Sequence, residues 1–262
     1  MLSLKVAILS EPGGRKYNED ACGYWSSDRQ FCCVLADGAG GHGGGDVASR
    51  LAVESLLARF SRTPSTSGPE LSQLVRQTNQ AVLDGRTSGT ILEQMHSTIV
   101  CLVIDFVDGR ADWVHSGDSR LYWFRDGHLL ERTRDHSFVE SLVDAGLIRP
   151  EETRGHPKRS VLRSALGNED EELELGGSTS SRIAAGGDVF LLCSDGVWEY
   201  LPDETLESLL RLARTPEEWL AAIEDGICDA TKELKSHDNY TALTIWLSGA
   251  AEVQGVQSPG EA

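Results

Sequence analysis

Long apolar runs and basic residues are both scarce in this sequence. No run approaches the ~18 residues that a membrane-spanning helix needs. Lysine and arginine number 24 against 41 aspartates and glutamates, which gives a formal net charge of −17. Because nucleic acids and anionic membranes are bound by basic surfaces, this balance argues against both as partners. The N-terminal stretch MLSLKVAILS is too short for a secretory signal, so we expect a cytoplasmic protein.

Cysteine pairs with metal-ligand or redox spacing are also missing. The six cysteines contain no CxxC pair, and most of them lie in apolar runs. Such residues are typical of buried, reduced thiols in a cytosolic protein. The 262 residues are 40% hydrophobic and 25% charged, an ordinary globular composition that can bury one large core or two small ones.

Short apolar runs rich in β-branched residues predict strands, and apolar residues at helical spacing predict helices. The predicted strands are Leu4–Leu9, Phe31–Leu35, Thr98–Ile104, Asp112–His115, Leu121–Phe124, Val189–Cys193 and Ala242–Leu247. The predicted helices are Val47–Phe60, Glu70–Leu83, Phe138–Ala145, Asp203–Leu212 and Pro216–Leu234. Asp126 and Gly127 predict a tight hairpin turn, since this dipeptide tolerates positive φ.

Strands and helices come in clusters rather than in strict alternation, which favours an α+β fold with mostly antiparallel sheets. Ser61–Pro69 is a polar connector between two helices. A mixed polar stretch from Asp135 to Leu173 holds one short helix and is expected to leave the core. The small, polar residues 248–262 are expected to form a disordered tail. The sequence therefore predicts one domain over residues 1–247.

Two apolar strands end in Asp-Gly, at Asp37 and at Asp195. Such a strand delivers a carboxylate at its buried end, and the glycine lets a ligand approach the backbone. Further acidic residues beside predicted strands are Asp20, Asp118 and Asp238. Each of them alone is typical of a turn. Together, carboxylates without interleaved Cys or His ligands favour hard cations such as Mg²⁺ or Mn²⁺ over zinc.

The segment from Gly38 to Gly45 formally matches the G-x-G-x-x-G motif of dinucleotide-binding proteins. That fold needs a second strand ending in an acid about 20 residues later, and no such strand follows here. His42 and its glycines are also similar to an esterase oxyanion loop, but the chain contains no G-x-S-x-G nucleophile motif. A P-loop lysine is missing as well. Nucleotide-binding and esterase functions are therefore disfavoured.

Several short motifs follow one another in a specific order. They are Arg15-Lys-Tyr-Asn18-Glu-Asp20, Ala36-Asp37-Gly38-Ala-Gly-Gly-His42, Gly117-Asp118-Ser119-Arg120-Leu-Tyr122, Asp135-His136-Ser137, Cys193-Ser194-Asp195-Gly196-Val-Trp198-Glu199 and Asp238-Asn239-Tyr-Thr-Ala. This succession resembles the bacterial branch of the metal-dependent protein Ser/Thr phosphatases of the 2C type, the PPM family. The resemblance spans roughly residues 5–247, and several motifs in order are more specific than one.

The resemblance implies a four-layer α-β-β-α sandwich of two antiparallel sheets, with a binuclear Mn²⁺ or Mg²⁺ centre at one end. Asp37 would bridge the two ions, and the Gly38 carbonyl would bind one of them. Asp118 matches the acid that family members use for a third, weaker ion. Residues 136–163 correspond to the flap beside the active site. The full set of implied metal ligands is Asp20, Asp37, Gly38, Asp118, Asp195 and Asp238.

The resemblance also implies roles for Arg15 and His42 in catalysis, beside the bridging Asp37. Arg15 would bind the substrate phosphate, for which a bidentate guanidinium is well shaped. His42 would protonate the leaving alkoxide. The alternatives are a plain surface cation at Arg15 and a mobile surface imidazole at His42. Two departures from the family pattern, at Ala39 and at His96-Ser97, remove no ligand.

We therefore predict a protein serine/threonine phosphatase that hydrolyses phosphoserine and phosphothreonine by in-line attack of metal-activated water. Its partners would be phosphoproteins and a cognate Ser/Thr kinase, and the chain is expected to be a monomer. Two alternatives stay open. One is a phosphatase of the same fold that is dedicated to one regulatory phosphoprotein. The other is a non-catalytic module that binds phosphoproteins.

Overall fold

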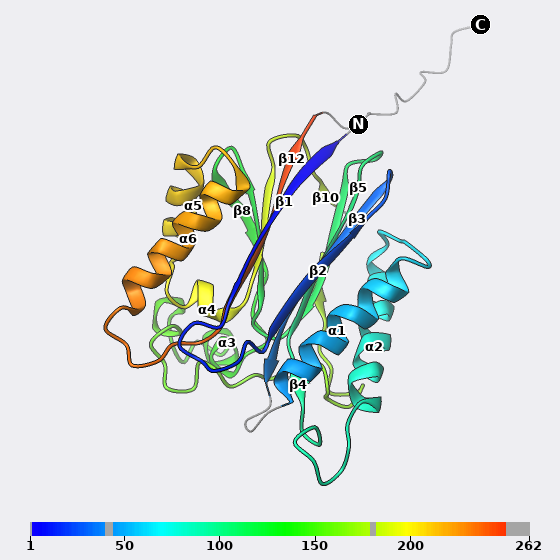
Figure 1. Cartoon of the computed structure of the whole chain (residues 1–262), viewed down its shortest axis with the longest axis vertical. Coiled ribbons are helices and arrows are strands. Elements are labelled where there is room, and N and C mark those ends of the chain that lie inside the picture. The colour runs from blue at the N-terminus through cyan, green and yellow to red at the C-terminus, as the bar shows by residue number, and fades with distance from the viewer. Residues whose placement is uncertain (1, 40–43, 179–181, 250–262) are drawn as a thin grey trace, which may run out of the picture.

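The computed structural model describes residues 2–39, 44–178 and 182–249. Within them the chain forms two antiparallel sheets that face each other, and helices cover the outer side of each sheet (Figure 1). The predicted α+β class and the four-layer α-β-β-α arrangement are thereby confirmed.

The sheet that contains both the first and the last strand has five strands among the described residues. Their order is β1 (Ser3–Glu11), β12 (Tyr240–Ser248), β11 (Val189–Cys193), β7 (Arg120–Arg125) and β8 (His128–Arg132). Strands β1 and β12 are paired along their whole length, from Ser3 opposite Ser248 to Glu11 opposite Tyr240. The two strands therefore lie side by side although the rest of the domain separates them in sequence.

The other sheet has seven strands among the described residues. Its main path runs through β10 (Arg182–Ile183), β6 (Arg110–Ser116), β5 (Ile99–Asp105), β3 (Gln30–Ala39) and β2 (Asp20–Ser26). Two short strands extend it, β4 (His96–Ser97) on β3 and β9 (Gly176–Gly177) on β6. All the strands predicted from sequence are present, whereas β2, β8 and the two-residue strands were missed.

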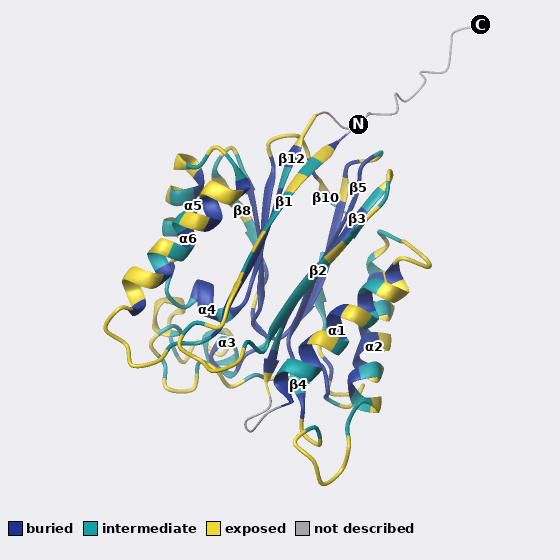
Figure 2. Cartoon of the chain, in the orientation of Figure 1, coloured by how far each residue is buried: buried dark blue, intermediate teal, exposed yellow. Residues whose placement is uncertain are grey.

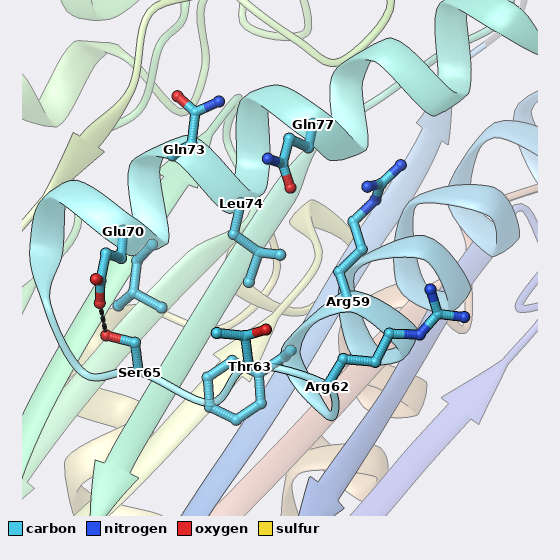
Figure 3. Close-up of a pocket in the computed structure, with 10 residues that line it drawn as sticks. Arg59, Arg62, Thr63, Ser65, Glu70, Gln73, Leu74 and Gln77 are labelled. Atoms are coloured by element: carbon cyan, nitrogen blue, oxygen red, sulfur yellow. Dashed lines mark hydrogen bonds between the residues drawn. The ribbon is translucent and has the colours of Figure 1, made fainter.

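Helices α1 (Gly45–Phe60) and α2 (Gly68–Asp84) cover the seven-stranded sheet. The buried side of α1 follows helical spacing at Ala48, Ala52, Leu56 and Phe60, which is why this sequence forms an amphipathic helix. Between the C-terminal end of α1 and the first turns of α2 lies an open pocket of about 380 Å³ (Figure 3).

Helices α5 (Asp203–Leu212) and α6 (Pro216–Thr231) cover the five-stranded sheet, and the one-turn helix α4 (Asp195–Trp198) follows β11 directly. The sequence prediction carried α6 on to Leu234, which was wrong. Beyond Thr231 the residues up to Ser236 are exposed, so no apolar contact holds another turn against the sheet. Helix α3 (Phe138–Asp144) and the 3-10 turn η1 (Pro150–Glu152) belong to the excursion between β8 and β9.

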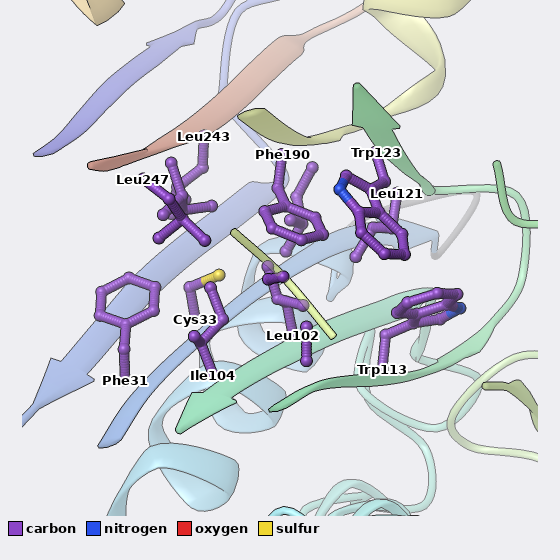
Figure 4. Close-up of a cluster of buried hydrophobic side chains, with 14 of the residues drawn as sticks. Phe31, Cys33, Leu102, Ile104, Trp113, Leu121, Trp123, Phe190, Leu243 and Leu247 are labelled. Atoms are coloured by element: carbon purple, nitrogen blue, oxygen red, sulfur yellow. The ribbon is translucent and has the colours of Figure 1, made fainter. Parts of the chain in front are cut away.

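The main core lies between the two sheets. Buried side chains from both sheets interdigitate there, among them Phe31, Leu102, Trp113, Trp123 and Phe190 (Figure 4). The central strands of both sheets are mostly buried, whereas exposed residues lie along β1 and on the helices and loops (Figure 2). Two further apolar clusters fill the space between each sheet and its helices. This rigid frame holds the strand ends that carry the acidic residues.

The predicted turn at Asp126 and Gly127 joins β7 to β8, and both residues have positive φ, 52° and 75°. The hairpin prediction is thereby confirmed. All six cysteines are free thiols. Among the described residues there is no helix with the length and apolarity needed to cross a bilayer.

Candidate active site

The acidic residues singled out from sequence lie at one end of the two sheets. Asp37 is near the end of β3, and Asp195 opens α4 directly after β11. Asp118 lies between β6 and β7, and Asp238 comes just before β12. These side chains reach a common pocket of about 340 Å³, whose lining residues are Arg15, Glu19, Asp37, Gly38, Ala39, Thr98, Asp118, Ser160, Leu162, Asp195, Asp238 and Asn239.

Asp20 lies beside this pocket without lining it. It is opposite Asp37 in the antiparallel pairing of β2 with β3. Its carboxylate accepts a hydrogen bond of 2.7 Å from the Ser194 hydroxyl. The neighbouring Glu19 lines the pocket instead. Burial, and then the charges of Asp46 and Asp238, raise the pKa of Glu19. Sequence reasoning named Asp20 and did not single out Glu19.

The carboxylates of the pocket destabilise one another's charged forms. Burial is the largest cause that raises the pKa of Asp37 far above its usual value, followed by the charges of Asp20, Asp195 and Asp118. Asp195 is affected in the same way, first by burial and then by Asp118 and Asp238. Burial also raises the pKa of Asp118 to about 7 and that of Asp20 to about 6. A cation held between these groups would relieve the repulsion.

Backbone and hydroxyl groups fix Asp37 in place. Its amide donates to the Thr98 hydroxyl at 2.9 Å, and its carbonyl accepts from the Thr98 amide at 2.8 Å. The Ser97 hydroxyl also donates to this carbonyl, at 3.0 Å. Thr98 then reaches the hydroxyl of Ser119, next to Asp118, at 2.7 Å. One threonine thus links the segments that carry Asp37 and Asp118.

Asn239 fixes another part of the pocket wall. Its side-chain oxygen accepts a 2.8 Å hydrogen bond from the amide of Glu19. Its side-chain nitrogen donates to the carbonyls of Pro12 and Tyr17. Thr98, Ser194 and Asn239 carry no charge, so sequence reasoning gave them no role. The available signal was their adjacency to the motifs, since Ser194 precedes Asp195 and Asn239 follows Asp238.

Gly38 occupies a position where only glycine fits. A Cβ atom there would collide with the backbone carbonyl of Gly45, at the start of α1, and would lie 2.7 Å from the Glu19 carbonyl. The Gly38 amide donates to that same Glu19 carbonyl at 3.0 Å. The absence of a side chain lets the β3 end, the Glu19 segment and α1 meet at the pocket wall.

Arg15 lies at the rim of the pocket. Its guanidinium donates to the Asp238 carboxylate at 2.9 Å, and the two side chains are 56% and 43% exposed. Arg15 is therefore placed beside the acidic residues of the pocket. His42 falls in residues 40–43 and lies outside the described residues.

The excursion from residue 136 to 163 borders the pocket, where Ser160 and Leu162 supply part of the wall. Arg159 of this segment pairs with Glu199, the residue after α4.

The pocket between α1 and α2 differs in chemistry (Figure 3). Its only lining carboxylate is Glu70, which accepts a hydrogen bond from Ser65. The acidic pocket is therefore the better candidate for catalysis.

The acidic pocket fits hard divalent cations by the chemistry of its donors. Its potential ligands are carboxylate and carbonyl oxygens, the type that Mg²⁺ and Mn²⁺ prefer. Within residues 2–39, 44–178 and 182–249, no three His, Cys, Asp or Glu side chains form a ready-made metal cluster. The mutual charge repulsion of Asp37, Asp118 and Asp195 is the observation that supports the fit.

Comparison with known proteins places the chain in a family. A family model described as protein phosphatase 2C matches residues 14–236. The serine/threonine protein phosphatase PstP of Mycobacterium tuberculosis is 39% identical over 220 residues, which cover 82% of this chain. This chain spans only 40% of the length of that relative. The serine/threonine phosphatase stp of Listeria innocua is 30% identical over 237 residues, 88% of this chain and 90% of the relative.

A solved structure gives the same result. The catalytic domain of the serine/threonine phosphatase PstP in complex with two manganese ions is 33% identical and superposes with a TM-score of 0.75. The match covers 95% of this chain and all of that one. The fold, the order of the motifs and these relatives agree, and this chain belongs to the protein phosphatase 2C family.

Proposed function

We propose that this chain is a metal-dependent protein serine/threonine phosphatase that hydrolyses phosphoserine and phosphothreonine with two Mn²⁺ or Mg²⁺ ions. The observation that carries the proposal is the convergence of Asp37, Asp118, Asp195 and Asp238 with Arg15 around one pocket. Membership of the protein phosphatase 2C family supports it, as does the manganese complex of PstP.

The proposed metal ligands are oxygen donors on five separate parts of the fold: β2, β3, the β6–β7 connection, α4 and the segment before β12. When bound, two divalent ions lower the pKa of water and neutralise phosphate charge. Asp37 would bridge both ions, and the Gly38 carbonyl would bind one of them. The remaining proposed ligands, with Asp118 serving a third and weaker ion, are Asp20, Asp118, Asp195 and Asp238.

Side chains of the protein then supply phosphate binding and proton transfer. Arg15 would turn from Asp238 to the phosphate oxygens, which a guanidinium can bind in a bidentate manner. Ser160 and Leu162 would limit the access of bulk water from the flap side. The thiols of Cys32 and Cys33 are not nucleophiles, because burial raises the pKa of both far above its usual value.

Hydrolysis of phosphopeptides tests the proposed function. With millimolar Mn²⁺ the protein should release phosphate from p-nitrophenyl phosphate and from phosphoserine and phosphothreonine peptides, and EDTA should stop both reactions. Hydrolysis confined to one phosphoprotein would indicate a dedicated phosphatase. Phosphopeptide binding without hydrolysis in any divalent metal would indicate a non-catalytic module and would contradict the proposal.

His42 is proposed as the general acid on the basis of its motif position. His42→Ala should slow the hydrolysis of phosphoserine peptides by about 10²–10⁴-fold, because an alkoxide leaving group needs a proton. Hydrolysis of p-nitrophenyl phosphate should fall much less, since p-nitrophenolate leaves without one. Equal losses on both substrates would remove His42 from this role.

Metal binding should also be visible in thermal stability. Binding to the native state alone contributes about 2.7 kcal/mol at a hundredfold excess over Kd, which corresponds to roughly 5–10 °C for a domain of this size. The melting temperature in millimolar Mn²⁺ should exceed that in EDTA by this amount, as measured by differential scanning fluorimetry. Superimposable melting curves would argue against the binuclear site.

We further propose that residues 1–247 act as one phosphatase domain with residues 136–163 as its flap, and that the protein is a cytoplasmic monomer opposing a Ser/Thr kinase. The continuous pairing of β1 with β12 supports the single domain. Limited proteolysis should spare this domain, and light scattering should give the mass of one chain. A dimeric mass would refute the monomer.

A further inference from the structure

A buried ion pair lies directly behind the acidic pocket. Arg120 opens β7, two residues after Asp118. Its Nε and Nη2 atoms donate to the two carboxylate oxygens of Asp135, both at 2.8 Å. Arg120 and Asp135 are each only 7% exposed. A bidentate pair of this kind holds its partners in one orientation. Because Asp135 directly precedes residues 136–163, the pair ties the base of the flap to β7.

The same guanidinium packs against the helix that carries Asp195. It lies over the indole ring of Trp198, 3.7 Å from the ring centroid. Trp198 is 5% exposed and is the last residue of α4, whose first residue is Asp195. Its indole Nε1 donates to the backbone carbonyl of Asp118 at 2.9 Å. Trp198 therefore connects the two segments that carry Asp118 and Asp195.

The Asp118 segment is held on its other side as well. Gly117 has a φ of 100°, and a Cβ atom there would lie 2.7 Å from the Thr98 side chain. Ser119 contacts the Thr98 hydroxyl at 2.7 Å, and that hydroxyl accepts from the Asp37 amide. The backbone around Asp118 is thus fixed between Thr98 on one side and Trp198 on the other.

We propose that Trp198 and Arg120 are positioning residues that set the placement of the Asp118 and Asp195 carboxylates for metal binding. The proposal rests on the proposed function. Neither side chain lines the acidic pocket, so both act through the backbone of Asp118 and through α4. A tryptophan suits this position because it offers a wide face for the guanidinium and one donor at its far edge.

Trp198→Phe tests the proposal, because phenylalanine keeps an aromatic face and lacks the donor to the Asp118 carbonyl. The Mn²⁺ concentration for half-maximal hydrolysis of p-nitrophenyl phosphate should rise about 10–100-fold, the usual effect of removing a partner of a metal ligand. The rise in melting temperature at a fixed, subsaturating Mn²⁺ concentration should shrink in parallel. This second measurement does not require turnover.

Trp219→Phe is the matched control. The Trp219 indole also donates to a backbone carbonyl, that of Leu206 at 3.3 Å, and its side chain is fully buried. It lies between the five-stranded sheet and its helices, and it does not line the acidic pocket. This variant should melt at a lower temperature than the wild type and need the same Mn²⁺ concentration for half-maximal hydrolysis. If Trp198→Phe behaves in the same way, its role is structural and the proposal fails.

Arg120→Lys provides a second, independent variant. Lysine keeps the charge beside Asp135 and lacks both the planar fork and the face that stacks on Trp198. The Mn²⁺ requirement should rise, and the double variant should show less than the sum of the two logarithmic shifts. Additive shifts would contradict a common unit. If the wild type binds Mn²⁺ without hydrolysing any phosphate ester, the proposed function fails. The melting measurements then still test whether Trp198 and Arg120 position the metal ligands.

Discussion

Replacing Asp37 by asparagine should lower turnover by at least about a thousandfold, since even the loss of an outer partner of a metal ligand costs about 10–100-fold. Asp37 is the proposed bridge between both metal ions, and Thr98 holds its backbone in place. The amide keeps the shape of the side chain and supplies a weaker, uncharged ligand. The measurement is initial-rate hydrolysis of p-nitrophenyl phosphate over a range of Mn²⁺ concentrations.

The metal-free variant should melt at the same temperature as the wild type or slightly higher. Burial, followed by the charges of the neighbouring aspartates, raises the pKa of Asp37 well above its usual value. A raised pKa of a carboxyl group in the folded state means that its charged form destabilises the fold at neutral pH, and asparagine removes that charge.

Asp105→Asn serves as the control, because the Asp105 carboxylate accepts from the amides of Val107 and Asp108 and does not line the acidic pocket. It should lose stability and keep turnover. Wild-type turnover in Asp37→Asn would eliminate the proposed bridge.

Asp135→Ala should reduce the free energy of unfolding by about 3–5 kcal/mol, because it leaves the Arg120 guanidinium buried without its partner. For a domain of this size the melting temperature should fall by roughly 10 °C. The guanidinium would retain the Tyr122 hydroxyl at 3.2 Å and the face of Trp198, which do not neutralise its charge. Chemical denaturation in EDTA measures the loss without a contribution from metal.

Glu174→Ala is the matched control for this prediction. It removes the partner of Arg163 in an ion pair of 2.7 Å whose side chains are 39% and 48% exposed. Because solvent screens exposed pairs, the expected loss is below about 1 kcal/mol. Similar small losses in both variants would show that Arg120 finds another partner or reaches solvent when Asp135 is missing.

The main architecture could be predicted from local sequence pattern. Strands β3 and β11 are continuous apolar runs, and both are almost entirely buried. Each leads directly to Asp37 or Asp195, so the position of two site carboxylates followed from the strands themselves. The family resemblance then supplied the order of the layers.

Other elements carried too little local pattern to be recognised. Strand β2 contains Gly23 and is only half-buried, because it lies at the edge of its sheet. Strands β4, β9 and β10 have two residues each, which is too short to show an alternating hydrophobic pattern. Their existence depends on the neighbouring strand rather than on their own sequence.

Several residues of the site could not be recognised from sequence for a related reason. Successive side chains of an extended segment point to opposite sides, so the choice between Glu19 and Asp20 at the pocket wall depends on how the chain enters β2. Asn239 and Ser194 act on residues more than 170 positions away, Glu19 and Asp20 respectively. Sequence spacing contains no information about such pairs.

The pairing of β1 with β12 has a consequence for biosynthesis. During translation, β1 is made before the other described strands of this domain and its partner β12 after them, with Asp238 just before β12. Until then β1 and β11 present unpaired edges, because β12 lies between them in the finished sheet. Because β1 and β12 are far apart in sequence, their pairing forms late and slows folding. Until β12 has been made, the edges of β1 and β11 are therefore open to aggregation, and Asp238 is not yet held at the acidic pocket.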